Sequence, residues 1–465
     1  MFSCLLNRGT PMILGSQQER QTHRATSGSG YFERVAARAN GGPHRAVRVV
    51  HVATQLSGGA AIAAGRLHTG LLRHGLDSHF LYLHGDTKHP GYARWQRRRR
   101  PLSQRIAGFL RERQGQRDTQ WYIHGRPAGY DLFSSTRQRD GIVFTDIDCA
   151  PDVIHLHWIS GAFDYRDFFR SVPATTPIVW TLHDMNPFTG GCHYSCGCTR
   201  YTDSCGNCPQ LSHPGPNDLS SRNLRDKQQA LAGRRLAVVA DSTWLAAEAR
   251  RSSVFRSVAA VSAINYGVDH ELFVANDKES CRVAFGLDPD RIVVCFGADG
   301  IQNPRKGMDL LLDALARSRF KDRIQLLVFG GGAIRQSVPG GMVIHNVGEI
   351  TSDVLLRSVY SSADIFVIAS RYEASGQTAL EAMACGVPVV GFNIGGIPDL
   401  VLPSVTGLLA EKENASDLRR CIDWLIENPG ERVRMGQRAR QRVEEGFTLA
   451  RQARDYVALY EELLA

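Results

Sequence analysis

Residues 373–390 read EASGQTALEAMACGVPVV and place two glutamates, Glu373 and Glu381, around the start of a short predicted helix. Residues 364–369 before this stretch are mostly apolar, which predicts a buried strand. The helix is predicted over residues 377–385, because a glycine and then a proline follow and end it. The valines after that proline begin another strand. The stretch is therefore typical of a parallel α/β sheet.

Glu373 lies in the loop at the carboxyl end of the first of these strands. The helix that follows begins near Ser375 and Gly376, and its first backbone N–H groups have no partner within the helix. Anions and sugars bind at such helix starts beside the carboxyl ends of parallel strands. The sequence therefore predicts a ligand crevice at this edge of the sheet.

The size and composition of the chain limit the class of protein to which it can belong. It has 465 residues, of which 43% are hydrophobic and 22% are charged, so two ordinary cores are expected. No apolar run is long enough to cross a membrane, and the first residues lack the pattern of a secretory signal. Five of the eleven cysteines crowd between Cys192 and Cys208, which argues against a secreted disulfide framework. We therefore expect a cytoplasmic protein.

The net charge of +9 favours anionic partners, and much of the excess lies at residues 94–117. Residues 97–100 are all arginine, and Ile106, Phe109 and Leu110 then share one face of a predicted helix. Such a basic amphipathic segment can rest on the anionic inner face of the cell membrane. It can equally be a solvated helix on an insertion, and the sequence leaves both alternatives open.

Strands and helices alternate twice along the chain, which predicts the fold class α/β with two doubly wound Rossmann-like domains facing across a cleft. The first series starts with a strand, a glycine turn at Gly58 and Gly59, and a helix. The predicted parts are a flexible extension at 1–46, a first domain at 47–265 with a basic insertion at about 88–140 and a cysteine-rich loop at 192–208, a second domain at 266–445, and a C-terminal helix at 446–465.

Arg305 and Lys306 follow the first strand of the second domain and precede its first helix. An arginine offers a fork for two phosphate oxygens and a lysine offers a compact charge, so this pair can neutralise a diphosphate without a metal ion. Basic residues at a helix start are common, and the signal gains weight only through Glu373 and Glu381 in the same domain.

The chain resembles the family 4 retaining glycosyltransferases, which have the GT-B fold. The resemblance covers nearly everything from Val47 onward and rests on Glu373, seven residues, Glu381, and the glycine, proline and valine pair that follow. Within the family, residues 181–194 (TLHDMNPFTGGCHY) and 204–211 (SCGNCPQL) resemble bacterial enzymes that assemble exopolysaccharides such as colanic acid.

The resemblance implies roles for individual residues. Glu373 would bind hydroxyls of the donor sugar and Glu381 the ribose, while Arg305 and Lys306 would stabilise charge on the leaving diphosphate. His183 would contact the donor sugar or the developing positive charge. The glycine loop would let the backbone approach the donor phosphate or the acceptor, although a tight turn alone explains its glycines equally well, and Gly376 would bring the backbone close to the phosphate. The remaining implied donor-binding positions are thus Gly58, Gly59, Ser375, Gly376 and Gln377. Where the family often has Glu-Gly-Phe-Gly, this chain has Glu-Ala-Ser-Gly, which leaves the identity of the donor sugar open.

The cysteine cluster allows two interpretations. Four thiolates in a short loop can hold a structural zinc ion, whereas reduced and partly buried thiols need no metal. The resemblance selects Cys192, Cys198, Cys205 and Cys208 as the zinc ligands. Catalysis itself is expected to need no cofactor.

The resemblance thus implies a retaining glycosyltransferase that uses a nucleotide-diphosphate sugar. Its expected acceptor is a saccharide, or one linked to polyprenyl diphosphate, in exopolysaccharide or cell-surface polysaccharide biosynthesis. A nucleotide-sugar epimerase of the same fold is an alternative, and would act without an acceptor. A basic nucleic-acid-binding protein with a zinc-like cysteine cluster is a more distant one, since it leaves the second domain unexplained. We expect no nucleic-acid partner.

Overall fold

The computed structural model describes residues 47–87, 89, 91–96, 117, 119–137, 142–258, 260–334 and 342–465. The predicted extension at 1–46 and the arginine run at 97–100, with the amphipathic face after it, lie outside the described residues. No helix in the described part of the chain is both long enough and apolar enough to cross a membrane.

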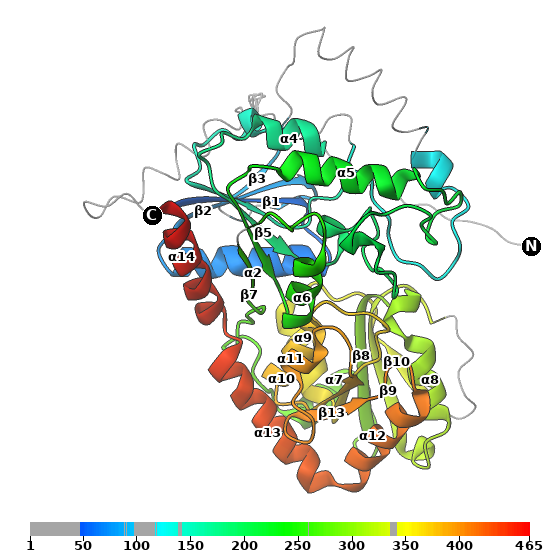
Figure 1. Ribbon diagram of the computed structural model, residues 1–465. Helices are drawn as coiled ribbons and strands as arrows, with labels where there is room; N and C mark the ends of the chain where they lie inside the picture. Colours follow the sequence, from blue (N-terminus) through cyan, green and yellow to red (C-terminus); the bar gives the residue numbers. More distant parts are fainter. Residues whose placement is uncertain are drawn as a thin grey trace, which may run out of the picture.

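The first domain is built on a parallel sheet of seven described strands, in the order β3-β2-β1-β4-β5-β6-β7 (Figure 1). Its central strands are buried along most of their length, as expected where helices cover both faces of a parallel sheet. The strands are β1 (Arg48–Gln55), β2 (Asp77–His84), β3 (Tyr92–Arg94), β4 (Val153–Leu156), β5 (Ile178–Leu182), β6 (Leu236–Ala240) and β7 (Ala260–Ala263). The helices are α2 (Gly59–Arg73), α4 (Tyr165–Ser171), α5 (Leu219–Leu231) and α6 (Thr243–Arg251).

The second domain has a parallel sheet of six described strands, in the order β10-β9-β8-β11-β12-β13. The strands are β8 (Ile292–Gly300), β9 (Ile324–Gly331), β10 (Val343–Asn346), β11 (Ile365–Ile368), β12 (Val389–Phe392) and β13 (Gly407–Ala410). The helices are α7 (Lys278–Ala284), α8 (Met308–Ala316), α9 (Asp353–Ser362), α10 (Gln377–Ala384), α11 (Ile397–Leu400), α12 (Ala415–Glu427) and α13 (Pro429–Gly446). The predicted strand, helix and strand around Glu373 are β11, α10 and β12. The prediction of two doubly wound α/β domains is confirmed.

The C-terminal helix α14 (Leu449–Leu464) leaves the second domain and packs against α2 of the first domain (Figure 1). Its buried face carries Tyr456 and Tyr460, which lie in the core under the first sheet. The Tyr460 hydroxyl lies 2.6 Å from Nδ1 of His155, and the Tyr456 hydroxyl lies 2.6 Å from the hydroxyl of Thr181. The last helix therefore joins the two domains through a buried polar contact to the strands that lead to the cleft.

We expect Tyr460→Phe to destabilise the chain, because it leaves the buried Nδ1 of His155 without its partner while keeping the ring. A buried unsatisfied polar group costs about 1–3 kcal/mol. Urea unfolding followed by tryptophan fluorescence measures this loss. Arg454→Gln on the exposed face of α14 is the matched control and should stay within about 0.5 kcal/mol of the wild type. Equal midpoints for Tyr460→Phe and the control would contradict the proposed role of this contact.

Candidate functional site

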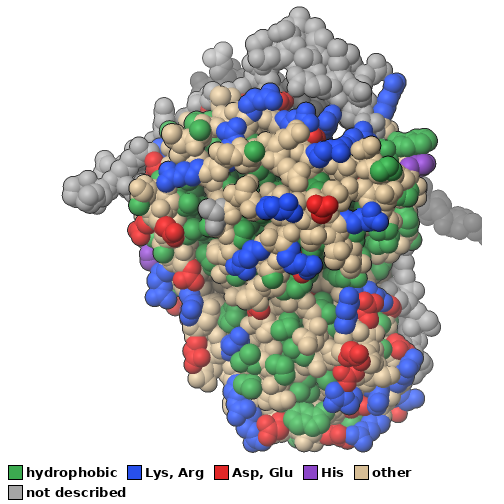
Figure 2. All heavy atoms as spheres, viewed as in Figure 1, with side chains coloured by type: hydrophobic (Ala, Val, Ile, Leu, Met, Phe, Trp, Pro, Cys, Tyr) green, Lys and Arg blue, Asp and Glu red, His purple; other side chains and the backbone are tan. Residues whose placement is uncertain are grey.

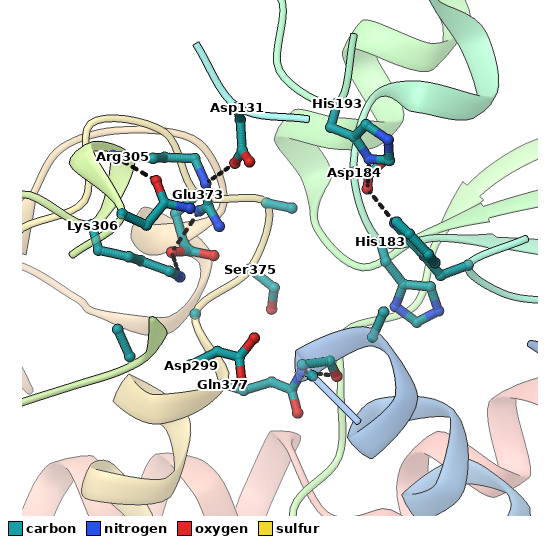
Figure 3. A pocket seen from close by; sticks show the side chains of 18 of the residues that line it. Asp131, His183, Asp184, His193, Asp299, Arg305, Lys306, Glu373, Ser375 and Gln377 are labelled. Carbon is teal, nitrogen blue, oxygen red and sulfur yellow. Dashed lines mark hydrogen bonds and ion pairs between the residues drawn. The ribbon is translucent and has the colours of Figure 1, made fainter. Parts of the chain in front are cut away.

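A cavity of about 300 Å³ lies between the two domains, at the carboxyl ends of both sheets. Figure 3 shows Arg305, Lys306 and Glu373 on one side of it and His183 on the other. Loops of both domains contribute side chains to its wall. Ligands commonly bind in such a position between two α/β domains.

Arg305 and Lys306 reach this cavity from a short 3-10 turn after β8. The side chain of Asn303 accepts a hydrogen bond from the backbone N–H of Arg305, and Gly307 ends the turn in the left-handed conformation with φ of 72°. A Cβ at Gly307 would lie 1.9 Å from the carbonyl oxygen of Ala369, so only glycine lets this turn pack against the end of β11. The turn thereby brings both cations to the Glu373 loop.

Glu373 is buried and surrounded by donors. Lys306 Nζ donates to its Oε2 at 2.7 Å, the Ser370 hydroxyl donates to the same oxygen at 2.9 Å, and Arg305 Nη1 lies 3.4 Å from it. Burial alone would raise the pKa of Glu373, but Lys306 and Arg305 outweigh burial and hold it at about 2. Burial lowers the pKa of the Lys306 ammonium, although Glu373 favours its charged form. The cavity wall therefore contains a compact cluster of opposite charges.

The sequence did not predict the first-domain residues that contact Arg305. Nε of Arg305 donates to Asp131 Oδ2 at 2.6 Å, and its guanidinium lies 4.6 Å from the ring centre of Tyr194. Asp131 lies in a loop without a recognisable pattern, so no sequence signal pointed to it. Tyr194 lies within the cysteine-rich segment that resembles the family. Through these contacts the first domain closes over Arg305.

The glycine turn and the start of α10 meet across the cavity, as the prediction for Gly58, Gly59, Ser375, Gly376 and Gln377 requires. Nε2 of Gln377 donates to the carbonyl of Gly59 at 2.6 Å. Both Gly58 and Gly376 have positive φ, at 84° and 109°. A Cβ at Gly376 would lie 2.8 Å from Ile397, so the turn before α10 also has little room for a side chain. The structure brings these predicted donor-binding residues together.

Glu381 is placed differently from the other predicted residues. It is buried on α10, away from the cavity wall, where Arg66 of α2 pairs with it at 2.7 Å and the Tyr360 hydroxyl donates to it at 2.7 Å. Contact with a ribose therefore requires Glu381 to exchange one of these partners. The interdomain partner Arg66 lies on the buried side of α2, and helix periodicity alone could not reveal this pairing.

His183 lines the cavity, but both of its ring nitrogens have protein partners. Nδ1 lies 2.5 Å from the Tyr266 hydroxyl and Nε2 lies 3.1 Å from Nδ1 of His157, whose Nε2 in turn lies 2.9 Å from His51. Burial lowers the pKa of His183 to about 4, so the imidazole is neutral at neutral pH. The predicted hydrogen bond from His183 to a sugar hydroxyl therefore requires exchange of Tyr266 or His157.

His51, His155 and His157 form the one group in the described part of the chain with three or more potential metal-ligand atoms within 4.8 Å of one another. His51 and His157 hydrogen-bond each other, whereas His155 hydrogen-bonds Thr181 and Tyr460. Burial lowers the pKa of each of them well below the ordinary value. The group is therefore a neutral hydrogen-bonded network beneath the site.

Asp241 is a further cavity residue that the sequence reasoning missed. It directly follows β6, and its Oδ1 has no hydrogen-bond partner among the described residues. Burial raises its pKa to about 8, against an opposing interaction with Tyr266. The rule that functional groups follow the carboxyl ends of parallel strands could have found it.

The predicted zinc cysteines Cys192, Cys198, Cys205 and Cys208 line one small cavity of about 20 Å³. Tetrahedral zinc with bonds of about 2.3 Å sets its sulfur ligands roughly 3.8 Å apart. The group of clustered ligand atoms found in the described part of the chain is the histidine group above and does not include these sulfurs. Burial raises the pKa of Cys205 to about 12 and of Cys208 to about 11, which favours neutral thiols. Zinc binding by these four residues stays a prediction.

Residues 278–442 match the family model described as Glycosyl transferases group 1. This match covers most of the second domain, which is therefore similar in sequence to the group 1 glycosyltransferases. The matched segment contains Arg305, Lys306, Glu373 and Glu381. The charge cluster in the cavity is thus formed mainly by residues of the matched segment.

Relatives and solved structures extend this finding. The D-inositol 3-phosphate glycosyltransferase of Kribbella flavida is 28% identical over 330 residues, which cover 66% of this chain and 70% of the relative. That of Segniliparus rotundus is 34% identical over 190 residues, or 38% of this chain and 42% of the relative. Sucrose-phosphate synthase from Thermosynechococcus elongatus superposes with a TM-score of 0.61 at 19% identity, over 90% of this chain and 99% of that chain. Anabaena HepE in complex with UDP-glucose superposes with a TM-score of 0.60 at 16% identity, over 89% of this chain and 99% of that chain. The two domains together thus have the GT-B fold.

Gly395→Ala should disrupt the Glu373 loop of the second domain. Gly395 has a φ of 51°, and a Cβ there would lie 1.9 Å from the carbonyl oxygen of Glu373. The clash and the strained backbone should cost about 1–3 kcal/mol and lower the melting temperature. Gly446→Ala, which meets nothing within 4 Å, is the control and should melt like the wild type. Unchanged melting of Gly395→Ala would show that the loop has room to move.

Asp241→Asn should stabilise the chain increasingly as the pH rises from 5 to 8. The folded chain keeps a proton on Asp241 up to about pH 8, whereas the unfolded chain releases it near the ordinary pKa, so the free energy of unfolding falls across this window. Asparagine removes this loss, and the difference from the wild type should grow by up to about 1.4 kcal/mol per pH unit. Urea unfolding at pH 5, 6, 7 and 8 measures it.

Asp277→Asn is the control for this pH series. Hydrogen bonds from Ser280 lower the pKa of Asp277, so its contribution is lost only at acidic pH and its difference from the wild type should stay constant from pH 5 to 8. If the difference in unfolding free energy between Asp241→Asn and the wild type were also constant from pH 5 to 8, the Asp241 carboxyl would not be protonated in the folded chain.

Proposed function

We propose that this protein is a retaining glycosyltransferase that transfers a sugar from a nucleotide-diphosphate sugar to an acceptor hydroxyl. The observation that carries this proposal is the cluster of Arg305, Lys306 and Glu373 on the wall of the interdomain cavity, within the matched domain. Two cations beside a buried carboxylate supply charge for a diphosphate and an acceptor for sugar hydroxyls in one place. Anabaena HepE, which has the same fold, was solved in complex with UDP-glucose, so UDP-glucose is the first donor to test.

In the proposed reaction the bond between the anomeric carbon and the diphosphate oxygen breaks, and the acceptor oxygen bonds to the same face of the sugar. The acceptor proton passes to the departing phosphate oxygen, so no protein nucleophile is needed. Arg305 and Lys306 stabilise the charge that develops on the diphosphate. Glu373 accepts hydrogen bonds from the sugar and keeps both cations in place. The group 1 domain thus binds and activates the donor.

We further propose that the acceptor is a saccharide carried on polyprenyl diphosphate at the inner face of the cell membrane, in exopolysaccharide or cell-surface polysaccharide biosynthesis. The support for this step is the resemblance of residues 181–194 and 204–211 to exopolysaccharide enzymes. The relatives are named D-inositol 3-phosphate glycosyltransferases, so D-inositol 3-phosphate is a second acceptor to test.

The donor site is tested by thermal shift with UDP-glucose and other nucleotide sugars, followed by nucleotide release in the presence of acceptors. Lys306→Gln should abolish most of the stabilisation by the donor and lower the transfer rate about 100-fold. Asp131→Asn should have the opposite effect on donor affinity, because the diphosphate no longer competes with Asp131 for Arg305. The exposed Lys321→Gln is the charge-matched control and should respond like the wild type.

Removal of Lys306 alone leaves Glu373 buried without its closest cation, which can itself destabilise the fold. The double variant Lys306→Gln/Glu373→Gln removes both charges and should recover stability but not donor binding. If no nucleotide sugar stabilises the wild type, or if the Lys306 variants respond as it does, the donor site is misassigned. Sugar interconversion without an acceptor would instead identify the epimerase alternative.

A further inference from the structure

A second cavity, of about 310 Å³, adjoins the proposed donor site, and apart from Glu373 its lining residues take no part in the donor binding proposed above. Glu373 lines both cavities, so a ligand in the second one lies next to the sugar-binding carboxylate. One wall comes from the cysteine-rich loop and from α6 of the first domain, and the other comes from residues 371–373, 394–395 and Lys412 of the second domain. The cavity therefore exists only where the two domains meet.

The side chains on the first-domain wall follow the helix repeat. Trp244, Glu248 and Arg251 are spaced four and three residues apart, so they share the face of α6 that lines the cavity. Tyr201 of the cysteine-rich loop donates its hydroxyl proton to Glu248. This wall therefore offers a half-buried indole ring beside a guanidinium.

The second-domain wall repeats this combination of an aromatic ring and a cation. Lys412 Nζ lies 4.4 Å from the ring centre of Tyr372, and both residues line the cavity. Arg371 is held by Asp309 at 2.6 Å, so it is tied to the structure of the loop. Flat aromatic rings next to polar groups are typical of sites for small cyclic ligands such as sugars.

The charges on the two walls point to the chemistry of the ligand. Arg251 is 54% exposed and pairs with Glu248 at 3.1 Å, and Lys412 is 45% exposed and lies 3.8 Å from Glu413. Such exposed pairs contribute little, so an incoming anion can exchange them at small cost. Of the two acids that line the cavity, Glu373 is already neutralised by Lys306. The cations Arg251 and Lys412 therefore remain available to a negatively charged group.

One face of the first domain carries mostly basic side chains (Figure 2). On the face shown in Figure 2, basic side chains dominate over the first domain, whereas basic and acidic side chains are interspersed over the second domain. A surface of one sign draws oppositely charged ligands toward a site within it.

We propose that this second cavity is the acceptor subsite and that it takes a six-membered saccharide or cyclitol ring bearing a carboxylate or phosphate. The ring lies against Trp244 and Tyr372, and Arg251 and Lys412 hold its anionic group. This assignment rests on the proposed function, since it names the acceptor class of that reaction. A shared wall at Glu373 brings donor and acceptor together, and both walls must close to complete the subsite.

The test uses rings of matched shape with and without charge. The anionic probes are D-inositol 3-phosphate, D-glucose 6-phosphate and D-glucuronate, and the neutral probes are myo-inositol and D-glucose. We expect at least one anionic ring to change the tryptophan fluorescence of the full chain, and its neutral counterpart to bind at least tenfold more weakly. Trp244→Phe should remove this signal. Comparison of the two phosphorylated probes with D-glucuronate shows whether the site prefers a phosphorylated ring or a uronic acid.

Variants separate this subsite from the donor site. Arg251→Gln and Lys412→Gln should each weaken binding of the anionic ring at least fivefold and leave the thermal shift with UDP-glucose unchanged. Arg454→Gln removes the same charge elsewhere and should change neither measurement. The inference is overturned if no ring binds, if neutral and anionic rings bind equally, or if these variants affect the donor as strongly as the ring.

The same data distinguish the two proposals. If nucleotide sugars stabilise the chain and no ring binds at Trp244, the donor site stands and the acceptor subsite is wrong. If anionic rings bind at Trp244 but no nucleotide sugar stabilises the chain, the anionic-ring site stands and the proposed transferase reaction fails.

Discussion

The buried charge cluster around Glu373 constrains the rest of the site. Glu373 can stay ionised beneath the surface only because Lys306 and Arg305 lie against it, and loss of one partner of such a cluster typically costs about 3–5 kcal/mol. The backbone holds the cluster in register, since the N–H of Arg371 donates to the carbonyl of Arg305 at 2.7 Å. Two loops that are more than sixty residues apart therefore form one unit.

Glycines make this close approach possible. Gly307 brings the cation turn against β11, and the Gly395 loop packs on the backbone of Glu373 from the other side. In each place a Cβ would overlap a carbonyl oxygen. The site thus depends on backbone packing that polar side chains alone would not reveal, and the short glycine segments after the strands provide it.

Local periodicity and the ends of strands were enough to predict one half of the site from the sequence. The strand, helix and strand around Glu373, the position of Arg305 and Lys306 after β8, and the glycine turn all come from patterns within short windows. Asp131 and Arg66 could not be predicted in this way. Each pairs with a second-domain residue that is distant in the sequence, and the packing of the two domains decides which residues meet. Only the folded chain brings these partners together.

The same contacts couple donor binding to the arrangement of the two domains. Asp131 of the first domain balances Arg305, and Arg66 of α2 balances Glu381, so in this arrangement two interdomain ion pairs engage residues of the proposed donor site. A diphosphate at Arg305 brings negative charge and must compete with Asp131, and a ribose at Glu381 must compete with Arg66 in the same way. A ligand shifts a conformational equilibrium only by its difference in affinity for the two states. The competing groups, Asp131 and Arg66, belong to the opposite domain. A bound nucleotide would therefore weaken the two ion pairs that hold the domains in this arrangement, and the domains would then close again around the donor itself.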